Sequence, residues 1–411
     1  MDLGGILDET AFRTLSNLTT NGLLFPNVRH LYCEYRPAGH ALHLPFPSLV
    51  SLDAIILDPG RVEAEISLRL LPELSPNLRN ITFGTYCSYG FVPVAFSKVV
   101  SNCICRWQNI QTVFCLPIAL DLDTLVHLSR MPALTQLDFA LDTPLPHSDS
   151  LLLFSNVHYF VLRSKRWTPV SRLLPQIRLP AITNFGVFVH SCPSRREFLS
   201  FLTSVQTHIP ARSLGILWIT QEFSSPPDVG RSDAPLLGLD DLRPCMAFHN
   251  LHRIKVKINW KVGLTDSDLL TLASALPHLY CLLLNPDFGW KTPGGITPSG
   301  LLRFLQLCRS LNEVSVAIDT RGYTEMPPSG TLANLTSTRP YSFYIDVLDS
   351  TIEAECVPVI AAFFACIEPR SGFHCSAWNG NEMVKPPGWE VYKDRWGDVS
   401  RRVTSAANHS S

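Results

Sequence analysis

The chain has 411 residues, of which 46% are hydrophobic and 17% are charged, with a formal net charge of −1. Nearly balanced charge excludes the basic excess of a general nucleic-acid-binding protein, so we expect no nucleic-acid partner. No apolar run approaches the ~20 residues that a membrane helix needs, and no secretory signal begins the chain. We therefore expect an intracellular protein, in the cytoplasm or the nucleus, with no membrane partner.

Residues 8–24 precede the first repeat-like segment and show a helical pattern. The end of a repeat stack needs a cover because its last core surface would otherwise face water. The sequence therefore predicts an N-terminal helical cap over residues 1–27.

One short phrase then recurs along the chain: an apolar anchor, two variable residues, an anchor, one variable residue and an anchor. The first copy has Val28, Leu31 and Cys33, and a degraded last copy has Phe343 and Ile345. The anchors between them are Leu49, Leu52, Ala54; Leu78, Ile81, Phe83; Ile110, Val113, Cys115; Leu134, Leu137, Phe139; Val157, Phe160, Leu162; Ile182, Phe185, Val187; Leu214, Leu217, Ile219; Leu251, Ile254, Val256; Leu279, Leu282, Leu284; and Leu311, Val314, Val316. This phrase is typical of the strand in a leucine-rich repeat. It predicts a solenoid of about twelve repeats over residues 28–347.

Helical patterns separate the strand phrases at residues 62–74, 92–107, 122–130, 195–208 and 351–367. Two further helices are expected to begin at Thr265, a capping residue before an acidic first turn, and at Thr297-Pro298. Strands that alternate with helices indicate a parallel sheet with helices on one side. The fold class predicted is therefore α/β, an irregular leucine-rich-repeat solenoid with a curved parallel β-sheet and helices on the convex side. The asparagine that regular short repeats place three residues after the last anchor is present only at Asn259.

Residues 348–411 depart from the phrase and carry Trp378, Trp389 and Trp396, the last two in an amphipathic stretch. They predict a C-terminal helical cap with a frayed tail.

Sequence signatures of catalysis are missing. We find no nucleophile elbow, phosphate loop, dinucleotide fingerprint or paired zinc-ligand spacing. The 12 cysteines are scattered, mostly at apolar positions, which favours buried thiols over the alternatives of disulfides or metal ligands. We therefore expect no enzyme and predict no catalytic, metal-binding or cofactor-binding residues.

The variable residues inside each phrase lie on the open face of the predicted sheet, because strand side chains alternate. The predicted face residues are His30, Tyr32, Glu34, Asp53, Asn80, Thr82, Thr112, Phe114, Gln136, Asp138, Tyr159, Val161, Arg163, Asn184, Phe188, Ile216, Trp218, Arg253, Lys255, Lys257, Glu313 and Tyr344. Aromatic and arginine side chains concentrate binding energy in interfaces. Our candidate partner-binding residues are Tyr159, Arg163, Trp218, Arg253, Lys255 and Lys257, facing a protein substrate or partner with an acidic segment. The alternative is that helices or the 222–245 loop cover this face.

Several segments carry a resemblance to a known family. They are 99–110 (VVSNCICRWQNI), 120–129 (LDLDTLVHLS), 264–275 (LTDSDLLTLASA), 294–298 (GGITP) and 392–396 (YKDRW). They resemble the F-box/leucine-rich-repeat proteins of mushroom-forming (basidiomycete) fungi. In that family an N-terminal F-box docks on the Skp-type adaptor of a cullin ubiquitin ligase, and the repeats select the substrate.

The start of the chain departs from that family, because the first repeat begins at Val28 and leaves no room for an F-box of ~40 residues. Two functions remain open. The chain resembles the substrate-recognition region of a ubiquitin ligase, with a Skp-type adaptor as partner only if an F-box is missing from this chain. The alternative is a repeat scaffold that binds a protein without any ligase link.

Overall fold

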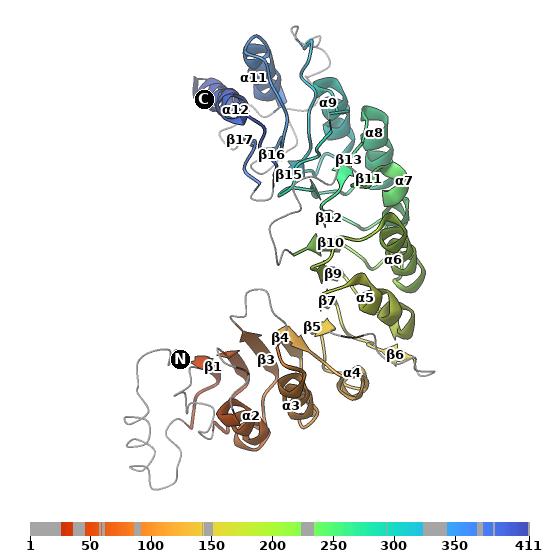
Figure 1. Cartoon of the computed structure of the whole chain (residues 1–411), viewed down its shortest axis with the longest axis vertical. Helices are drawn as coiled ribbons and strands as arrows, with labels where there is room; N and C mark the ends of the chain where they lie inside the picture. The colour runs from red at the N-terminus through yellow and green to blue at the C-terminus, as the bar shows by residue number, and fades with distance from the viewer. Residues whose placement is uncertain are drawn as a thin grey trace. The chain divides into compact units, whose positions relative to one another are not determined.

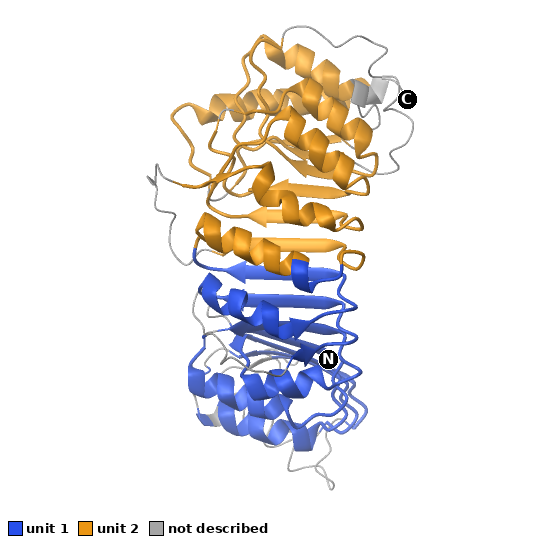
Figure 2. Ribbon diagram, turned by 90° about the vertical axis from the view of Figure 1, so that its right-hand side faces the viewer, with its two compact units in different colours: residues 1–191, 207–210 blue, residues 192–206, 211–411 orange. Residues whose placement is uncertain are grey.

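The structure is a computed structural model that describes residues 26–35, 46–56, 59, 62–85, 92–141, 143, 151–222, 234–292, 294–323, 343–367, 373–380 and 383–409. The chain divides into two compact units (Figure 2). Unit 1 comprises residues 1–191 and 207–210, and unit 2 comprises residues 192–206 and 211–411. The boundary between the units falls inside the predicted repeat region. The repeat pattern gives no sign of it, because the phrase continues on both sides. The predicted helix over 8–24 lies outside the described residues.

Thirteen principal strands follow one another in chain order, and every register given for neighbouring pairs is parallel. In unit 1 they are β1 (His30–Tyr35), β2 (Ser51–Ile56), β3 (Asn80–Thr85), β4 (Thr112–Ala119), β5 (Gln136–Leu141), β7 (Tyr159–Ser164) and β9 (Asn184–Val189). In unit 2 they are β10 (Ile216–Gln221), β12 (Arg253–Lys257), β14 (Cys281–Leu284), β15 (Glu313–Ser315), β16 (Phe343–Asp346) and β17 (Phe373–Ser376). The predicted fold class, an α/β leucine-rich-repeat solenoid, is confirmed.

The anchors of the phrase form the core, because each strand places the same anchor beside that of the next strand. In unit 1 Leu52 pairs with Ile81 and Ala54 with Phe83, and all four are at most 1% exposed. In unit 2 Leu282 lies between Ile254 and Val314 in the same way. Burying one such side chain contributes about 1.5–3 kcal/mol, so the repeated ladder supplies most of the driving force for folding.

Strand β17 is an addition to the predicted repeats. It lies in the segment assigned from sequence to the C-terminal cap, yet it pairs in parallel with β16, and Cys375 continues the anchor ladder beside Ile345. The pattern misses it because only Phe373 and Cys375 remain of the phrase.

Helices follow most strands on one face of the sheet in each unit (Figure 1). Unit 1 has α2 (Val62–Leu74), α3 (Val94–Ile104), α4 (Leu122–Ser129) and α5 (Trp167–Leu173). Unit 2 has most of α6 (Arg195–His208), then α7 (Leu239–Leu242), α8 (Asp266–Ala275), α9 (Pro298–Leu307), α11 (Cys356–Ile367) and α12 (Trp389–His409). The bounds of α2 and α6 are those predicted, whereas α11 begins five residues later than the predicted 351.

Local sequence sets the helix starts. The Thr265 side chain accepts a hydrogen bond from Asp268 N while the Asp268 carboxylate accepts one from Thr265 N, a reciprocal cap that begins α8. Thr297 caps α9 ahead of Pro298, whose missing N–H is not needed there. Two short parallel pairs accompany the main strands, β6 (Leu152–Leu153) with β8 (Ile177–Arg178) and β11 (Leu236–Leu237) with β13 (Lys261–Val262).

Candidate recognition surface

The open face of the unit 1 sheet begins with a row of polar side chains, one from the first residue of each strand. The row, which we call the polar row, consists of His30, Ser51, Asn80, Thr112, Gln136, Tyr159 and Asn184, aligned in register. None of these side chains is buried. Neighbouring strands are about 4.8 Å apart, so the row repeats donors and acceptors at that spacing.

Five members of the polar row, those other than His30 and Tyr159, make no side-chain hydrogen bond with any described residue. Amide and hydroxyl groups prefer a partner, which is either water or a bound molecule. These five side chains are therefore available for recognition without breaking a hydrogen bond to any described residue.

Tyr159 and Arg163 of the predicted site lie on β7 of unit 1, within a cluster of face residues. The Tyr159 ring is 5.7 Å from the Phe114 ring, and the Arg163 guanidinium lies 4.5 Å from the centre of the Phe188 ring. Arg163 Nε also donates to Asp138 Oδ1 at 2.9 Å. Burial, with the Asp138 carboxylate second, raises the pKa of the Tyr159 hydroxyl, which therefore stays a neutral donor.

Asp138 and Val161 were expected to be exposed on this face, and that expectation is wrong. Asp138 is 3% exposed and Val161 is fully buried. Asp138 lies under the guanidinium of Arg163. Val161 pairs with Asp138 and Gly186 and is shorter than Tyr159 and Arg163, its neighbours on the same face of β7.

The other four residues of the predicted site lie in unit 2. Trp218 of β10 pairs in register with Lys255 of β12, and both are partly exposed. Arg253 and Lys257 lie two residues to either side of Lys255 on the same face. The structure brings these four together on one face, while Tyr159 and Arg163 belong to the other unit.

The basic strand of unit 2 is largely neutralised by acidic residues that follow it in the chain. Arg253 forms an ion pair with Glu313 at 3.0 Å, and Lys257 forms one with Asp287 at 2.5 Å. Among the described residues, Lys255 has no ion-pair partner. The three cations that the sequence shows therefore present a single uncompensated positive charge.

Beyond the basic strand, the unit 2 face becomes more buried. Cys281, which pairs with Arg253 and Glu313, is fully buried; burial raises the pKa of its thiol to about 12, so it stays protonated. Asp346 is 7% exposed, and burial raises the pKa of its carboxyl to about 6. Its Oδ1 accepts a hydrogen bond from Leu348 N. Two short side chains in the same row, Ser315 and Ser376, are also buried.

The described part of the 222–245 segment packs with the helices. Asp241 of α7 is fully buried and accepts hydrogen bonds from Arg195 of α6 at 2.7 Å and 3.3 Å. Residues 223–233 lie outside the described part of the chain. The described residues 234–245 thus pack with the helices.

Side-chain bridges between strand ends replace the asparagine ladder, and the sequence reasoning missed them. Gln221 Oε1 accepts from Asn259 N at 2.8 Å, and Ser350 Oγ accepts from Ile318 N at 2.7 Å. Asn285 is fully buried, with Oδ1 accepting from Ile258 N and Nδ2 donating to Trp260 O, both at 3.0 Å. Asn259 itself accepts from Lys291 Nζ. Searching a single spacing after the last anchor overlooks these residues.

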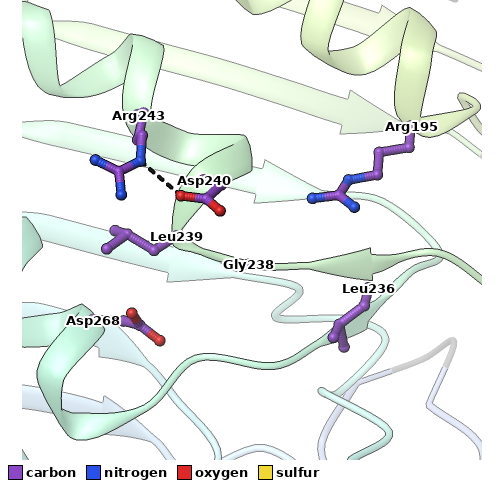
Figure 3. Close-up of a pocket in the computed structure, with 7 residues that line it drawn as sticks. All are labelled: Arg195, Leu236, Gly238, Leu239, Asp240, Arg243 and Asp268. Carbon is purple, nitrogen blue, oxygen red and sulfur yellow. Dashed lines mark hydrogen bonds and ion pairs between the residues drawn. The ribbon is translucent and has the colours of Figure 1, made fainter.

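A cavity of about 290 Å³ opens in unit 2 between α6, α7 and the start of α8 (Figure 3). Its lining residues are Arg195, Leu236, Gly238, Leu239, Asp240, Arg243 and Asp268. The charges around it are already used: Arg195 binds Asp241, Arg243 binds Asp240 at 2.7 Å, and Asp268 caps α8. This cavity offers no unpaired group that selects a ligand.

In the part of the chain that the structure describes, no group of three or more His, Cys, Asp or Glu side chains is arranged to hold a metal ion. The cysteines with described side chains are free thiols, mostly buried. Across the same residues, no helix combines the length and apolar character that crossing a bilayer requires.

Comparisons with known proteins add little to this description. No family model matches the chain, and no curated protein matches it in sequence. The solved structures that resemble it include a chain of the Toll–Spatzle complex, described as a molecular hub in Drosophila development and innate immunity. That match has a TM-score of 0.33 and 13% sequence identity, and covers 93% of this chain and 56% of the other. Nothing about function follows from a likeness at this level.

Proposed function

We propose that this chain is a non-enzymatic scaffold that recognises a protein partner on the open face of its sheet. The observation that carries the proposal is the polar row of unit 1. Five strands, β2 to β5 and β9, each present an amide or hydroxyl that has no hydrogen-bond partner among the described residues. Side chains of this kind add nothing to the core, and a repeat fold that keeps them in register presents an extended binding surface.

Three members of the row provide the test. Replacing Asn80, Thr112 and Gln136 together with alanine removes three neighbouring hydrogen-bonding groups from β3, β4 and β5. Each neutral hydrogen bond to a partner contributes about 1 kcal/mol, so calorimetry should show a loss of about 3 kcal/mol in binding. The free energy of unfolding should change little, because no internal hydrogen bond is lost.

A matched control has the same three residue types on the helix side of unit 1. Asn102 in α3, Gln108 in the turn after it and Thr168 in α5 are exposed and make no side-chain hydrogen bond within the part of the chain that the structure describes. Their triple replacement with alanine should leave partner affinity unchanged. Equal losses of affinity in the two triple variants would contradict a recognition role for the sheet face.

The resemblance to F-box/leucine-rich-repeat proteins supports a more specific proposal, that the repeats select a substrate for a cullin ubiquitin ligase. We infer that such a link needs a Skp-type adaptor. If the protein has an F-box that this chain lacks, the protein that carries it should co-purify with that adaptor in a one-to-one proportion. Binding of a protein partner without any adaptor in the complex would favour the scaffold without a ligase link.

A further inference from the structure

The unit 2 face holds one cation in an apolar setting. Lys255 of β12 pairs in register with Trp218 of β10 on one side and with Leu283 of β14 on the other. Parallel strands are about 4.8 Å apart, so both apolar side chains lie directly beside the lysine stem. An ammonium group flanked by apolar surface is less hydrated than one on an open surface, which strengthens any ion pair it forms.

The charges around Lys255 decide which ligand fits. Arg253 and Lys257 are neutralised by Glu313 and Asp287, at 3.0 Å and 2.5 Å. These four groups and Lys255 together carry three positive and two negative charges, which leaves one positive charge.

A third acidic group lies in the same row as Lys255. The register runs from Lys255 to Leu283, then to Ser315 and to Asp346, three strands away. A phosphate with two negative charges would exceed this one positive charge, and it would also face Glu313 and Asp287, the acidic partners of Arg253 and Lys257. A single carboxylate matches the one free positive charge.

We propose that Lys255 binds an aspartate or glutamate side chain of a protein partner, and that an adjacent apolar side chain of that partner packs on Trp218. The inference rests on the proposed function and names the kind of segment that unit 2 takes. It fits a short motif in which one acidic residue lies between large apolar residues. Tryptophan supplies rigid contact area and the lysine supplies the selectivity for charge.

The test uses a fluorescein-labelled synthetic peptide, Gly-Ser-Leu-Phe-Glu-Leu-Gly-Ser, and the same peptide with glutamine in place of glutamate. Fluorescence anisotropy with the full chain should show at least tenfold tighter binding of the glutamate peptide. Lys255→Met should abolish that difference, and Lys255→Arg should keep it. Because Lys255 has no ion-pair partner among the residues that the structure describes, Lys255→Met leaves none of their charges unpaired, and an unchanged melting temperature verifies its fold.

The matched control is Lys393→Met on α12, an exposed lysine that likewise has no ion-pair partner among the described residues. It should bind both peptides as the wild type does. Equal affinity for the two peptides, or an equal effect of the two lysine substitutions, would overturn the proposal.

Two other results would show that a different molecule binds this face, and each would overturn the proposal. Tighter binding of a phosphoserine peptide than of the glutamate peptide would assign Lys255 to a phosphate. Self-association in sedimentation velocity that Lys255→Met removes would assign the face to a second copy. The proposed function is tested separately in unit 1, so its triple alanine variant can still weaken partner binding when the peptide experiment fails.

Discussion

Replacing Leu282 with alanine tests whether the anchor ladder holds unit 2 together. Leu282 is 1% exposed and lies in register between Ile254 and Val314. The substitution removes three carbon atoms, which costs about 2.4 kcal/mol in lost burial at about 0.8 kcal/mol for each methylene. A residual cavity raises the cost, so we expect a loss of about 3–5 kcal/mol in the free energy of unfolding.

Urea denaturation followed by circular dichroism measures this loss, and hydrogen exchange at β12, β14 and β15 locates it. The matched control is Leu307→Ala in α9 of the same unit, where the leucine is 48% exposed. That variant should lose less than about 1 kcal/mol in the free energy of unfolding, because the side chain is half exposed and its removal takes away little buried apolar area. Similar losses for Leu282→Ala and Leu307→Ala would refute the assignment of the phrase to an inward-facing ladder.

Three further substitutions follow from the same structure. Asn285→Ala should lower the free energy of unfolding, measured by urea denaturation, by about 2–4 kcal/mol. It leaves Ile258 N and Trp260 O unpaired and places alanine at a φ of 53°. A loss below about 0.5 kcal/mol would show that the hydrogen bonds of the Asn285 side chain are dispensable. Burial raises the pKa of Asp346 from 3.8 to about 6, so the folded state holds this proton more tightly than the unfolded chain. The stability that this protonated carboxyl contributes is therefore complete below about pH 4 and is lost as the pH rises through 6. Relative to Asp346→Asn, the free energy of unfolding of the wild type should fall by about 3 kcal/mol over this range. Parallel curves of unfolding free energy against pH for the two proteins would contradict the pKa shift. Trp218→Ala should weaken partner binding by about 2 kcal/mol with a melting temperature close to that of wild type, whereas a matching fall in both would make Trp218 a core residue.

Much of the fold follows from the sequence because the repeat phrase reports burial directly. Each inward anchor must be apolar, so Leu137, Leu217 and Leu282 are recognisable without any structure, and all three are buried. The helix starts at Thr265 and Thr297 were also predictable, because each depends on a capping residue and its close neighbours in the sequence. Strand β17 was not predicted, because only two anchors of the phrase, Phe373 and Cys375, are present to continue the ladder.

The recognition surface is less accessible to sequence reasoning, because charge on one strand depends on its neighbours. Arg253 and Lys257 looked like a basic patch with Lys255, but their partners Glu313 and Asp287 come from later segments of the chain. The division between two units was also invisible, since the phrase continues on both sides of residue 191. By contrast, the polar row could be predicted, because alternation alone places Asn80, Thr112 and Gln136 on the open face.

Site-specific photo-cross-linking tests the central claim, that the open sheet face recognises a protein. A benzophenone amino acid is placed at Gln136 on the sheet face of unit 1 or at Asn102 on its helix side, and cross-linked products are identified by mass spectrometry in cells that express the chain. We expect a discrete protein adduct from Gln136 that is absent from Asn102 and is lost when Asn80 and Thr112 are alanine. Adducts of the same protein from Asn102, with none from Gln136, would place recognition on the helices and contradict the account.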